Sequence, residues 1–113
     1  MQKTVMRKRV IIETTYAGNV DHNIDYARAC MADSLLRDEA PIASHLIYTQ
    51  PGILDDRIPE ERKAGIESGF AWWEAAELIV FYTDLGWSNG MKAAWDRLGK
   101  ANISFTMRTL KSD

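Results

Sequence analysis

The first third of the chain changes from the hydrophobic period of a strand to that of a helix. Residues 9–14, RVIIET, form a short β-branched run that predicts a strand. Residues 20–40 then place apolar side chains at helical spacing, which predicts a helix with one buried face. Asn19 is positioned to cap this helix, and Asp21 and Asp25 lie near the positive end of its dipole. The expected buried face consists of Ile24, Ala27, Met31 and Leu35.

The middle of the chain repeats this alternation. Residues 43–49, ASHLIYT, predict a second strand, and the loop of residues 50–59 contains two prolines and a glycine. Pro59 opens a second helix at a position where proline is tolerated, and two acidic residues follow it. The expected buried side of this helix consists of Ile66, Phe70 and Trp73.

The last third of the chain holds the most apolar segment. Residues 78–82, LIVFY, are nearly all apolar, which is typical of a central strand covered on both faces. A third helix follows and ends at Gly99, and residues 103–107 predict a fourth strand. The apolar stripe of the third helix consists of Met91, Ala94, Trp95 and Leu98.

Strands and helices thus alternate, which predicts an α/β fold with a parallel sheet between helices. We expect one domain over residues 1–113, because a chain of this length has room for a single hydrophobic core. The expected architecture is a flavodoxin-like or Rossmann-like three-layer sandwich. Its parallel sheet has four to five strands in the order 2-1-3-4.

Charge and cysteine content narrow the function. The formal net charge is −2, with both signs spread along the chain, so no basic block predicts nucleic-acid binding. Cys30 is alone, which excludes an internal disulfide and a CxxC motif. The apolar stretch after the N-terminus is too short for a signal peptide or a membrane span. A lone cysteine fits a reducing, cytoplasmic setting. Because the HExxH, GxGxxG and P-loop motifs are missing, we expect no metal and no cofactor.

Polar side chains follow three of the predicted strands. The carboxyl ends of parallel strands meet at one edge of the sheet, where open α/β sheets bind ligands. Tyrosines beside hydrogen-bonding groups suit a heterocycle joined to a sugar, although loops are polar in any protein. The candidate ligand-binding residues are Thr15, Tyr16, Gly18, Asn19, Tyr48, Gln50, Asp84, Ser88, Asn89, Gly90, Met91 and Lys92.

Lys92 and the two histidines have separate interpretations. Lys92 falls in the first turn of the third helix, where a cation opposes the helix dipole. It is either a solvated lysine or a clamp for a phosphate or carboxylate beside the free N–H groups. His22 is expected in solvent, and His45 is expected to be partly buried and hydrogen-bonded.

Residues 80–103, VFYTDLGWSNGMKAAWDRLGKANI, resemble the nucleoside 2-deoxyribosyltransferase superfamily, including an uncharacterised phage and bacterial branch of it. In that superfamily a Gly-Met-Glu triplet opens a helix, and a Gly-Lys pair precedes the next strand. Gly90, Met91 and Lys92 fall on the triplet, and Gly99 and Lys100 fall on the pair. The turn ETTYAGN after the first strand is also similar.

The superfamily's nucleophile is the glutamate of that triplet, and Lys92 stands in its place. The resemblance therefore implies binding of a nucleotide or nucleoside-like molecule without glutamate chemistry, for instance sequestration of a nucleotide signal by a phage protein in the host cytoplasm. The alternative is an N-glycosidic bond hydrolase or transferase that uses Asp84 or Glu67 as its catalytic carboxylate. A third hypothesis is a structural oligomer that binds no ligand.

Adjacent tryptophans bear on the oligomeric state. Trp72 and Trp73 diverge by about 100° on a helix, so one small core does not easily bury both. Either one of them is half-exposed, or one packs in a subunit interface, where tryptophan is enriched. We expect a homodimer or a larger homo-oligomer, because superfamily sites are often completed by a neighbouring subunit.

Overall fold

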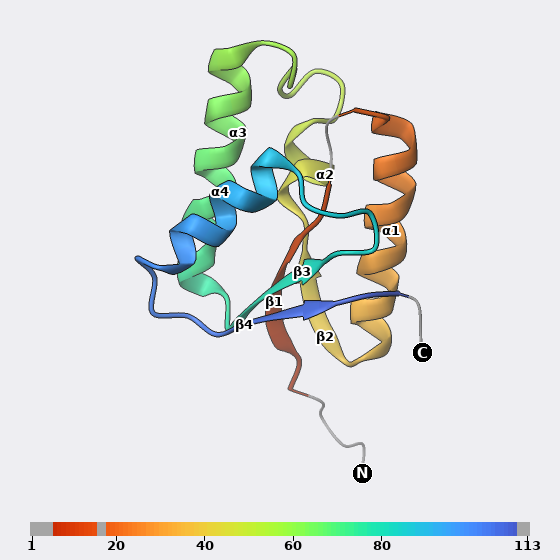
Figure 1. The fold of residues 1–113 in the computed structure, drawn as a ribbon, viewed down its shortest axis with the longest axis vertical. Helices are drawn as coiled ribbons and strands as arrows, with labels where there is room; N and C mark the ends of the chain where they lie inside the picture. Colours follow the sequence, from red (N-terminus) through yellow and green to blue (C-terminus); the bar gives the residue numbers. More distant parts are fainter. Residues whose placement is uncertain (1–5, 16–17, 111–113) are drawn as a thin grey trace.

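The structure, a computed structural model, describes residues 6–15 and 18–110. Within these residues four parallel strands form one sheet in the order β2-β1-β3-β4 (Figure 1). The strands are β1 (Lys8–Glu13), β2 (Glu39–Ile42), β3 (Leu78–Tyr82) and β4 (Phe105–Arg108). The α/β class and the strand order expected from the sequence are therefore confirmed.

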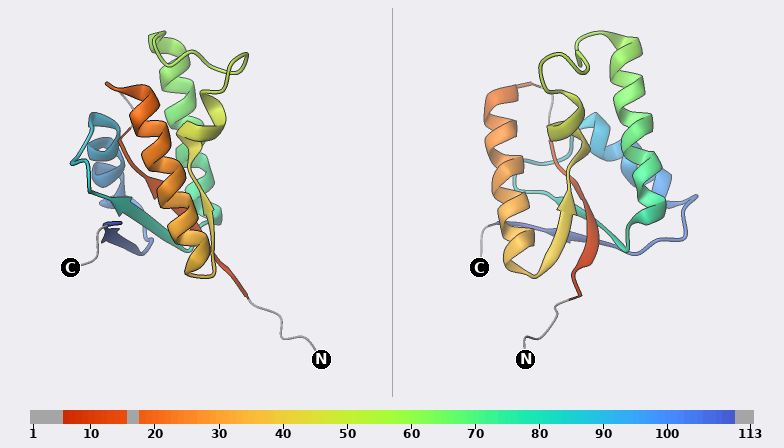
Figure 2. Two further views of the ribbon diagram at one scale, coloured as in Figure 1. Left: turned by 90° about the vertical axis from the view of Figure 1, so that its right-hand side faces the viewer. Right: turned by 180° about the vertical axis from the view of Figure 1, so that it is seen from behind.

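Helices pack on both faces of the sheet. The α1 helix (Val20–Leu36) covers one face. The α3 helix (Pro59–Ala71), the 3-10 helix η1 (Trp72–Ala75) and α4 (Asn89–Leu98) lie on the other, and the short α2 helix (Ser44–Tyr48) packs against α3. In Figures 1 and 2, α1 and α3 stand on opposite sides of the β1–β2 pair. None of the helices in the described segments is long and apolar enough to cross a membrane.

The two central strands divide the core into two clusters. Because side chains alternate along a strand, Val10 and Ile12 of β1 face α1, whereas Ile11 faces α3 and α4. The β3 strand follows the same rule, and its side chains from Ile79 to Tyr82 are fully buried. The prediction that residues 78–82 form a central strand is confirmed.

The predicted helix ends follow from local chemistry. The Asn19 side chain accepts a hydrogen bond from the His22 N–H at 3.2 Å and caps α1. Pro59 starts α3, and Gly99 follows the last residue of α4. Ser88 caps α4 by accepting a hydrogen bond from the Met91 N–H at 3.2 Å.

The predicted strand at residues 43–49 is wrong, because this segment contains α2. A five-residue apolar run such as SHLIY fits a buried strand or a buried helix equally well. The α1 helix, expected to reach residue 40, instead ends at Leu36, and Asp38 takes a left-handed φ of 61° to turn the chain into β2. The β2 strand lies at the sheet edge, where Pro41 is tolerated although it lacks an N–H.

The buried face of α1 also differs from the predicted stripe. Small and polar residues face the sheet, and Leu35 is 50% exposed. Two of these residues bond to the sheet side: Asn23 accepts a hydrogen bond from Thr15, and Ser34 donates one to Glu39. The apolar pattern of the sequence does not reveal that small and polar residues fill this face. The residues of this face are Asn23, Ala27, Cys30 and Ser34.

The two adjacent tryptophans have different surroundings. Trp73 is buried among the residues that pack under α3 and α4. Trp72 is 48% exposed, donates its indole N–H to the Tyr48 hydroxyl at 2.7 Å, and lines an apolar groove of about 400 Å³ with Leu35 and Ile42. One tryptophan is therefore half-exposed. The subunit interface at this position stays a prediction.

Candidate functional site

A cleft of about 140 Å³ opens at the carboxyl edge of the sheet, beyond the ends of β1 and β3. The connections from these two strands leave in opposite directions, because α1 leads to β2 and α4 leads to β4. In parallel sheets this is the position at which ligands bind. The lining residues are Glu13, Thr14, Ser44, His45, Asp56, Arg62, Ile66, Gly69, Phe70, Ser88, Asn89 and Gly90.

Glu13 is the last residue of β1 and lies on the strand face that Ile11 occupies. A carboxyl group therefore stands where the alternation of the strand calls for an apolar side chain. Burial raises the pKa of Glu13 to about 8, and the neighbouring Trp73 indole lowers it only in part. The Trp73 N–H itself is buried without a hydrogen bond in good geometry among the described residues. At neutral pH the Glu13 carboxyl is therefore uncharged.

His45 enters the cleft from the first turn of α2. Its Nε2 lies 2.8 Å from the Thr14 hydroxyl oxygen. Because that hydroxyl donates to the Thr15 carbonyl oxygen at 3.3 Å, we assign His45 Nε2 as a donor to Thr14. Burial lowers the pKa of His45 to about 4, so the imidazole is neutral at pH 7. The expectation of a partly buried, hydrogen-bonded histidine is confirmed.

An ion pair contributes the charged groups of the cleft. Arg62 Nη1 of α3 lies 2.9 Å from Asp56 Oδ2, in the loop that precedes the helix. The charges of these two side chains cancel, and Glu13 and His45 are both neutral. The described lining of the cleft therefore carries no net charge at neutral pH. Across the described residues, no group of three or more His, Cys, Asp or Glu side chains is arranged to hold a metal ion.

The start of α4 forms the opposite wall. Ser88, Asn89 and Gly90 line the cleft there, as the sequence predicted for these three residues. The first turn of a helix leaves backbone N–H groups without partners inside the helix, so this wall offers hydrogen-bond donors. Donors at α4 thus face a carboxyl group and an imidazole across the cleft.

A protein-family model for a domain of unknown function, DUF7768, matches residues 8–108. The chain belongs to the DUF7768 family. The matched segment begins at the first residue of β1 and ends at the last residue of β4, so it contains every lining residue of the cleft. No match was found among curated proteins or among solved structures.

Several predicted ligand-binding residues make structural contacts in the DUF7768 fold. Thr15 is buried and donates to Asn23 Oδ1 at 3.0 Å, and Asn19 caps α1. Gly18 adopts a left-handed φ of 96°, and Met91 lies in the core. Tyr16 falls outside the described residues.

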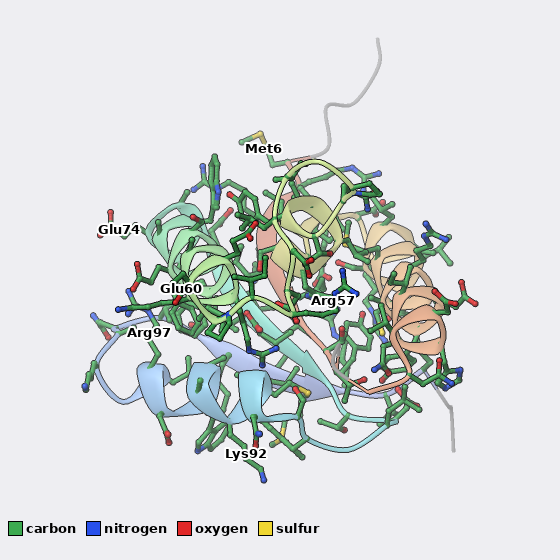
Figure 3. All side chains as sticks on the ribbon, turned by 90° about the horizontal axis from the view of Figure 1, so that it is seen from above. Met6, Arg57, Glu60, Glu74, Lys92 and Arg97 are labelled. Atoms are coloured by element: carbon green, nitrogen blue, oxygen red, sulfur yellow. The ribbon has the colours of Figure 1, made fainter. Side chains whose placement is uncertain are left out.

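Other predicted residues lie on the surface or away from the cleft. Lys92 is exposed on the outer side of α4, as Figure 3 shows from above. Glu67 is exposed on α3, where it lies 3.8 Å from the Lys63 ammonium group. Tyr48 accepts a hydrogen bond from Trp72, and the exposed Gln50 donates to the Leu46 carbonyl oxygen at 2.8 Å. The structure therefore does not bring these four side chains together.

Asp84 lies on the α1 side of the sheet and ties three segments together. Its carboxylate accepts a hydrogen bond from the Tyr26 hydroxyl at 2.5 Å and from the Leu110 N–H at 2.9 Å. Its own N–H donates to the Tyr26 hydroxyl oxygen at 2.9 Å. Burial, together with this carboxylate, raises the pKa of Tyr26 above its usual value. These contacts connect the β3–α4 turn, α1 and the end of β4.

We therefore expect Asp84→Ala to lower the free energy of unfolding by about 2 kcal/mol, because the Tyr26 hydroxyl and the Leu110 N–H lose their partner. Urea unfolding followed by tryptophan fluorescence measures this loss. Tyr26→Phe in the wild type and in the Asp84→Ala background completes a double-mutant cycle. A loss for Asp84→Ala below about 0.5 kcal/mol, the usual size for a surface substitution, would show that these contacts add no stability.

The sequence interpretation missed Glu13, Asp56 and Arg62, and it placed His45 on a strand. One signal was present for Glu13, since an acid at the core-facing position of a buried strand is unusual unless it has a role. Asp56 and Arg62 carried no such signal, because loops and first helical turns are commonly charged.

Proposed function

We propose that this DUF7768 domain binds a nucleoside or nucleotide-like small molecule in the cleft beyond β1 and β3. The observation that carries the proposal is the convergence of Glu13, His45 and the start of α4 on one cleft at the point where the strand connections diverge. Titratable groups with strongly shifted pKa values gather at functional sites more often than elsewhere. Both Glu13 and His45 have such shifts.

The chemistry of the lining supports a heterocyclic ligand. Phe70 and Ile66 supply apolar surface, and the carboxyl, imidazole, hydroxyl and backbone N–H groups supply directed hydrogen bonds. Sites for small organic ligands combine these two kinds of surface. A superfamily-type glutamate nucleophile is not part of the proposal, because Lys92 holds that position and lies outside the cleft.

The test is a thermal-shift panel of ribonucleosides and their monophosphates. A ligand at 100 times its Kd is expected to add about 2.7 kcal/mol to the free energy of unfolding. Gly90→Leu should abolish the shift, because it fills the α4 wall of the cleft; a Cβ on Gly90 meets nothing closer than the Ser88 Oγ at 3.8 Å.

The matched control is Ala93→Leu, which adds the same side chain to an exposed position of α4. This variant should keep the full shift. Equal losses in the two leucine variants, or no stabilisation of the wild type by any member of the panel, would contradict the proposal.

Lys92→Ala tests the anion clamp suggested by the sequence. Since Lys92 is exposed and does not line the cleft, the variant should bind a monophosphate as the wild type does. A tenfold loss confined to phosphorylated ligands would instead place the phosphate at Lys92.

A second candidate function is hydrolysis or transfer at an N-glycosidic bond. The carboxyl groups that line the cleft are Glu13 and Asp56, whereas Asp84 and Glu67 do not line it. A protonated Glu13 suits a general acid that delivers a proton to a departing base, because its pKa of about 8 keeps that proton at neutral pH. Release of free base from a nucleoside, lost in Glu13→Gln, would establish this function in place of binding alone.

A further inference from the structure

The Glu13 carboxyl lines the cleft, and the buried Trp73 indole lies beside it. The Trp73 indole N–H is buried and lacks a partner in good geometry among the described residues. The Glu13 carboxyl lies close enough for Trp73 to influence its pKa, and it also lines the cleft. Buried polar groups are almost always hydrogen-bonded in proteins, and of these two groups the Glu13 carboxyl is the one that a ligand in the cleft contacts.

We propose that the Glu13 carboxyl is the ligand-recognition group of the cleft and pairs with the edge of an uncharged heterocycle that carries one hydrogen-bond donor beside one acceptor. Lactams and ring amidines, which are the edges of nucleobases, have this arrangement. The inference rests on the proposed function and narrows it to recognition through the base rather than through a phosphate.

The hydrogen-bonding capacity of Glu13 fits such an edge. A protonated carboxyl group has one O–H donor and a carbonyl acceptor side by side, whereas a carboxylate only accepts. Glu13 ends β1 on the strand face that α3 and α4 cover. Its donor and its acceptor therefore lie on the side of the sheet where the cleft is. A neutral carboxyl in an apolar site is a known arrangement for donating a hydrogen bond at pH 7.

The charges around Glu13 argue against a phosphate at this floor. From α2, His45 is neutral; from α3 and its preceding loop, Arg62 already lies 2.9 Å from Asp56. From η1, Trp73 is uncharged, and the start of α4 contributes Ser88, Asn89 and Gly90. A phosphate would therefore have to share Arg62 with the negative charge of Asp56. Among these side chains, Glu13 is the one whose charge changes between pH 6.5 and 9.5.

The experiment is calorimetry with adenosine, cytidine, uridine and inosine as probes, and with their 5′-monophosphates. At pH 6.5 at least one nucleoside is expected to bind, with its monophosphate within threefold of the same Kd. Glu13→Met keeps the length of the side chain without its polar groups. This variant should weaken binding of that nucleoside at least tenfold.

The pH dependence is the sharper readout. Because the Glu13 O–H is lost on ionisation with a pKa of about 8, wild-type affinity for the bound nucleoside should fall about fivefold between pH 8 and pH 9. In Glu13→Gln the amide cannot ionise, so this pH dependence should disappear. Any pH dependence that remains in the variant measures the ionisation of the nucleoside itself and is subtracted from the wild-type result.

The outcomes separate this inference from the function on which it rests. A wild-type affinity that is constant to pH 9.5 after this correction, or equal binding by Glu13→Met, would overturn the role of Glu13 while leaving the binding function in place. Monophosphates that bind more than tenfold tighter than nucleosides would also overturn it. Failure of all eight probes to bind the wild type would overturn both.

Discussion

Replacing Arg108 with methionine is expected to lower the free energy of unfolding by about 3–5 kcal/mol, the range for breaking a buried ion pair. Arg108 Nη2 lies 2.6 Å from Glu39 Oε2, and Nη1 lies 2.8 Å from Oε1. Only 13% of the Arg108 side chain and 11% of the Glu39 side chain are exposed. The substitution leaves the Glu39 carboxylate buried, and among the described residues the Ser34 hydroxyl remains as a donor to it at 2.7 Å.

The position of this pair explains the size of the effect. It joins β4 at one edge of the sheet to β2 at the other, across the face that α1 covers. The Arg108 guanidinium lowers the pKa of Glu39, chiefly through these hydrogen bonds. This side-chain contact therefore links two strands that share no backbone pairing.

Arg37→Met is the matched control for Arg108→Met. Arg37 Nε lies 3.0 Å from Asp33 Oδ2, but 47% of its side chain is exposed, so the loss should stay below about 1 kcal/mol. Guanidinium unfolding at pH 7 measures both variants. The double variant Arg108→Met with Glu39→Gln should recover part of the loss, because it removes the unpaired charge. Equal losses for Arg108→Met and Arg37→Met would show that the Arg108–Glu39 pair adds nothing beyond a surface pair.

The second large effect is a change in the pH dependence of stability in Glu13→Gln. In the folded protein burial raises the pKa of Glu13 from 4.5 to about 8, so the folded state holds a proton that the unfolded state releases. The free energy of unfolding therefore falls as pH rises through this window. The shift corresponds to about 5 kcal/mol, so Glu13→Gln should gain about that much relative to wild type between pH 4.5 and pH 9.

His45 shapes the wild-type profile in the opposite sense. Its folded pKa is lowered from 6.5 to about 4, so the unfolded state binds the extra proton and stability falls as pH drops through that window. Between pH 4.5 and 6.5 the contributions of Glu13 and His45 cancel, and the wild-type free energy of unfolding should be level. Above pH 6.5 Glu13 acts alone, and a loss of about 2 kcal/mol is expected by pH 8.

Urea unfolding at half-unit steps of pH measures both profiles. The Glu13→Gln profile should lack the decline above pH 6.5. The His45→Gln profile should begin to decline already at pH 4.5. A wild-type profile that stays level up to pH 9 would mean that the Glu13 carboxyl ionises without cost and is open to water.

Local sequence chemistry determined most of the architecture. The alternation of β-branched runs with helical stripes is enough to predict a parallel sheet in the order β2-β1-β3-β4, because connection rules leave few other topologies. The ends at Asn19, Pro59 and Gly99 follow from side-chain capping and backbone limits that act within one turn. Such features depend on near neighbours, so the sequence displays them.

The segment from residue 37 to residue 49 was decided by tertiary structure. The short β2 strand, EAPI, gains its backbone hydrogen bonds only by pairing with β1, and it contains a proline that argues against a strand. Its pairing leaves the apolar run SHLIY free to form α2 and to pack against α3. No local sequence pattern shows that EAPI forms the strand and SHLIY the helix, rather than the reverse.

The candidate site also has a part that the sequence predicted and a part that only the tertiary structure shows. The rule that ligands bind at the carboxyl edge led from the sequence to Ser88, Asn89 and Gly90, which line the cleft. The rule does not say on which face of the sheet a strand-end side chain falls. Glu13 falls on the α3 and α4 face and enters the cleft, whereas Asp84 falls on the α1 face and meets Tyr26.

The sequence by itself thus determined the fold class, the strand order, the helix caps and the edge of the sheet at which a ligand is expected. Only the tertiary structure decided which residues meet at that edge, because β1, α2, α3 and α4 reach the cleft from distant parts of the chain. It also decided their chemistry. The charge states of Glu13 and His45 depend on burial, and burial is a property of the packed molecule rather than of either residue.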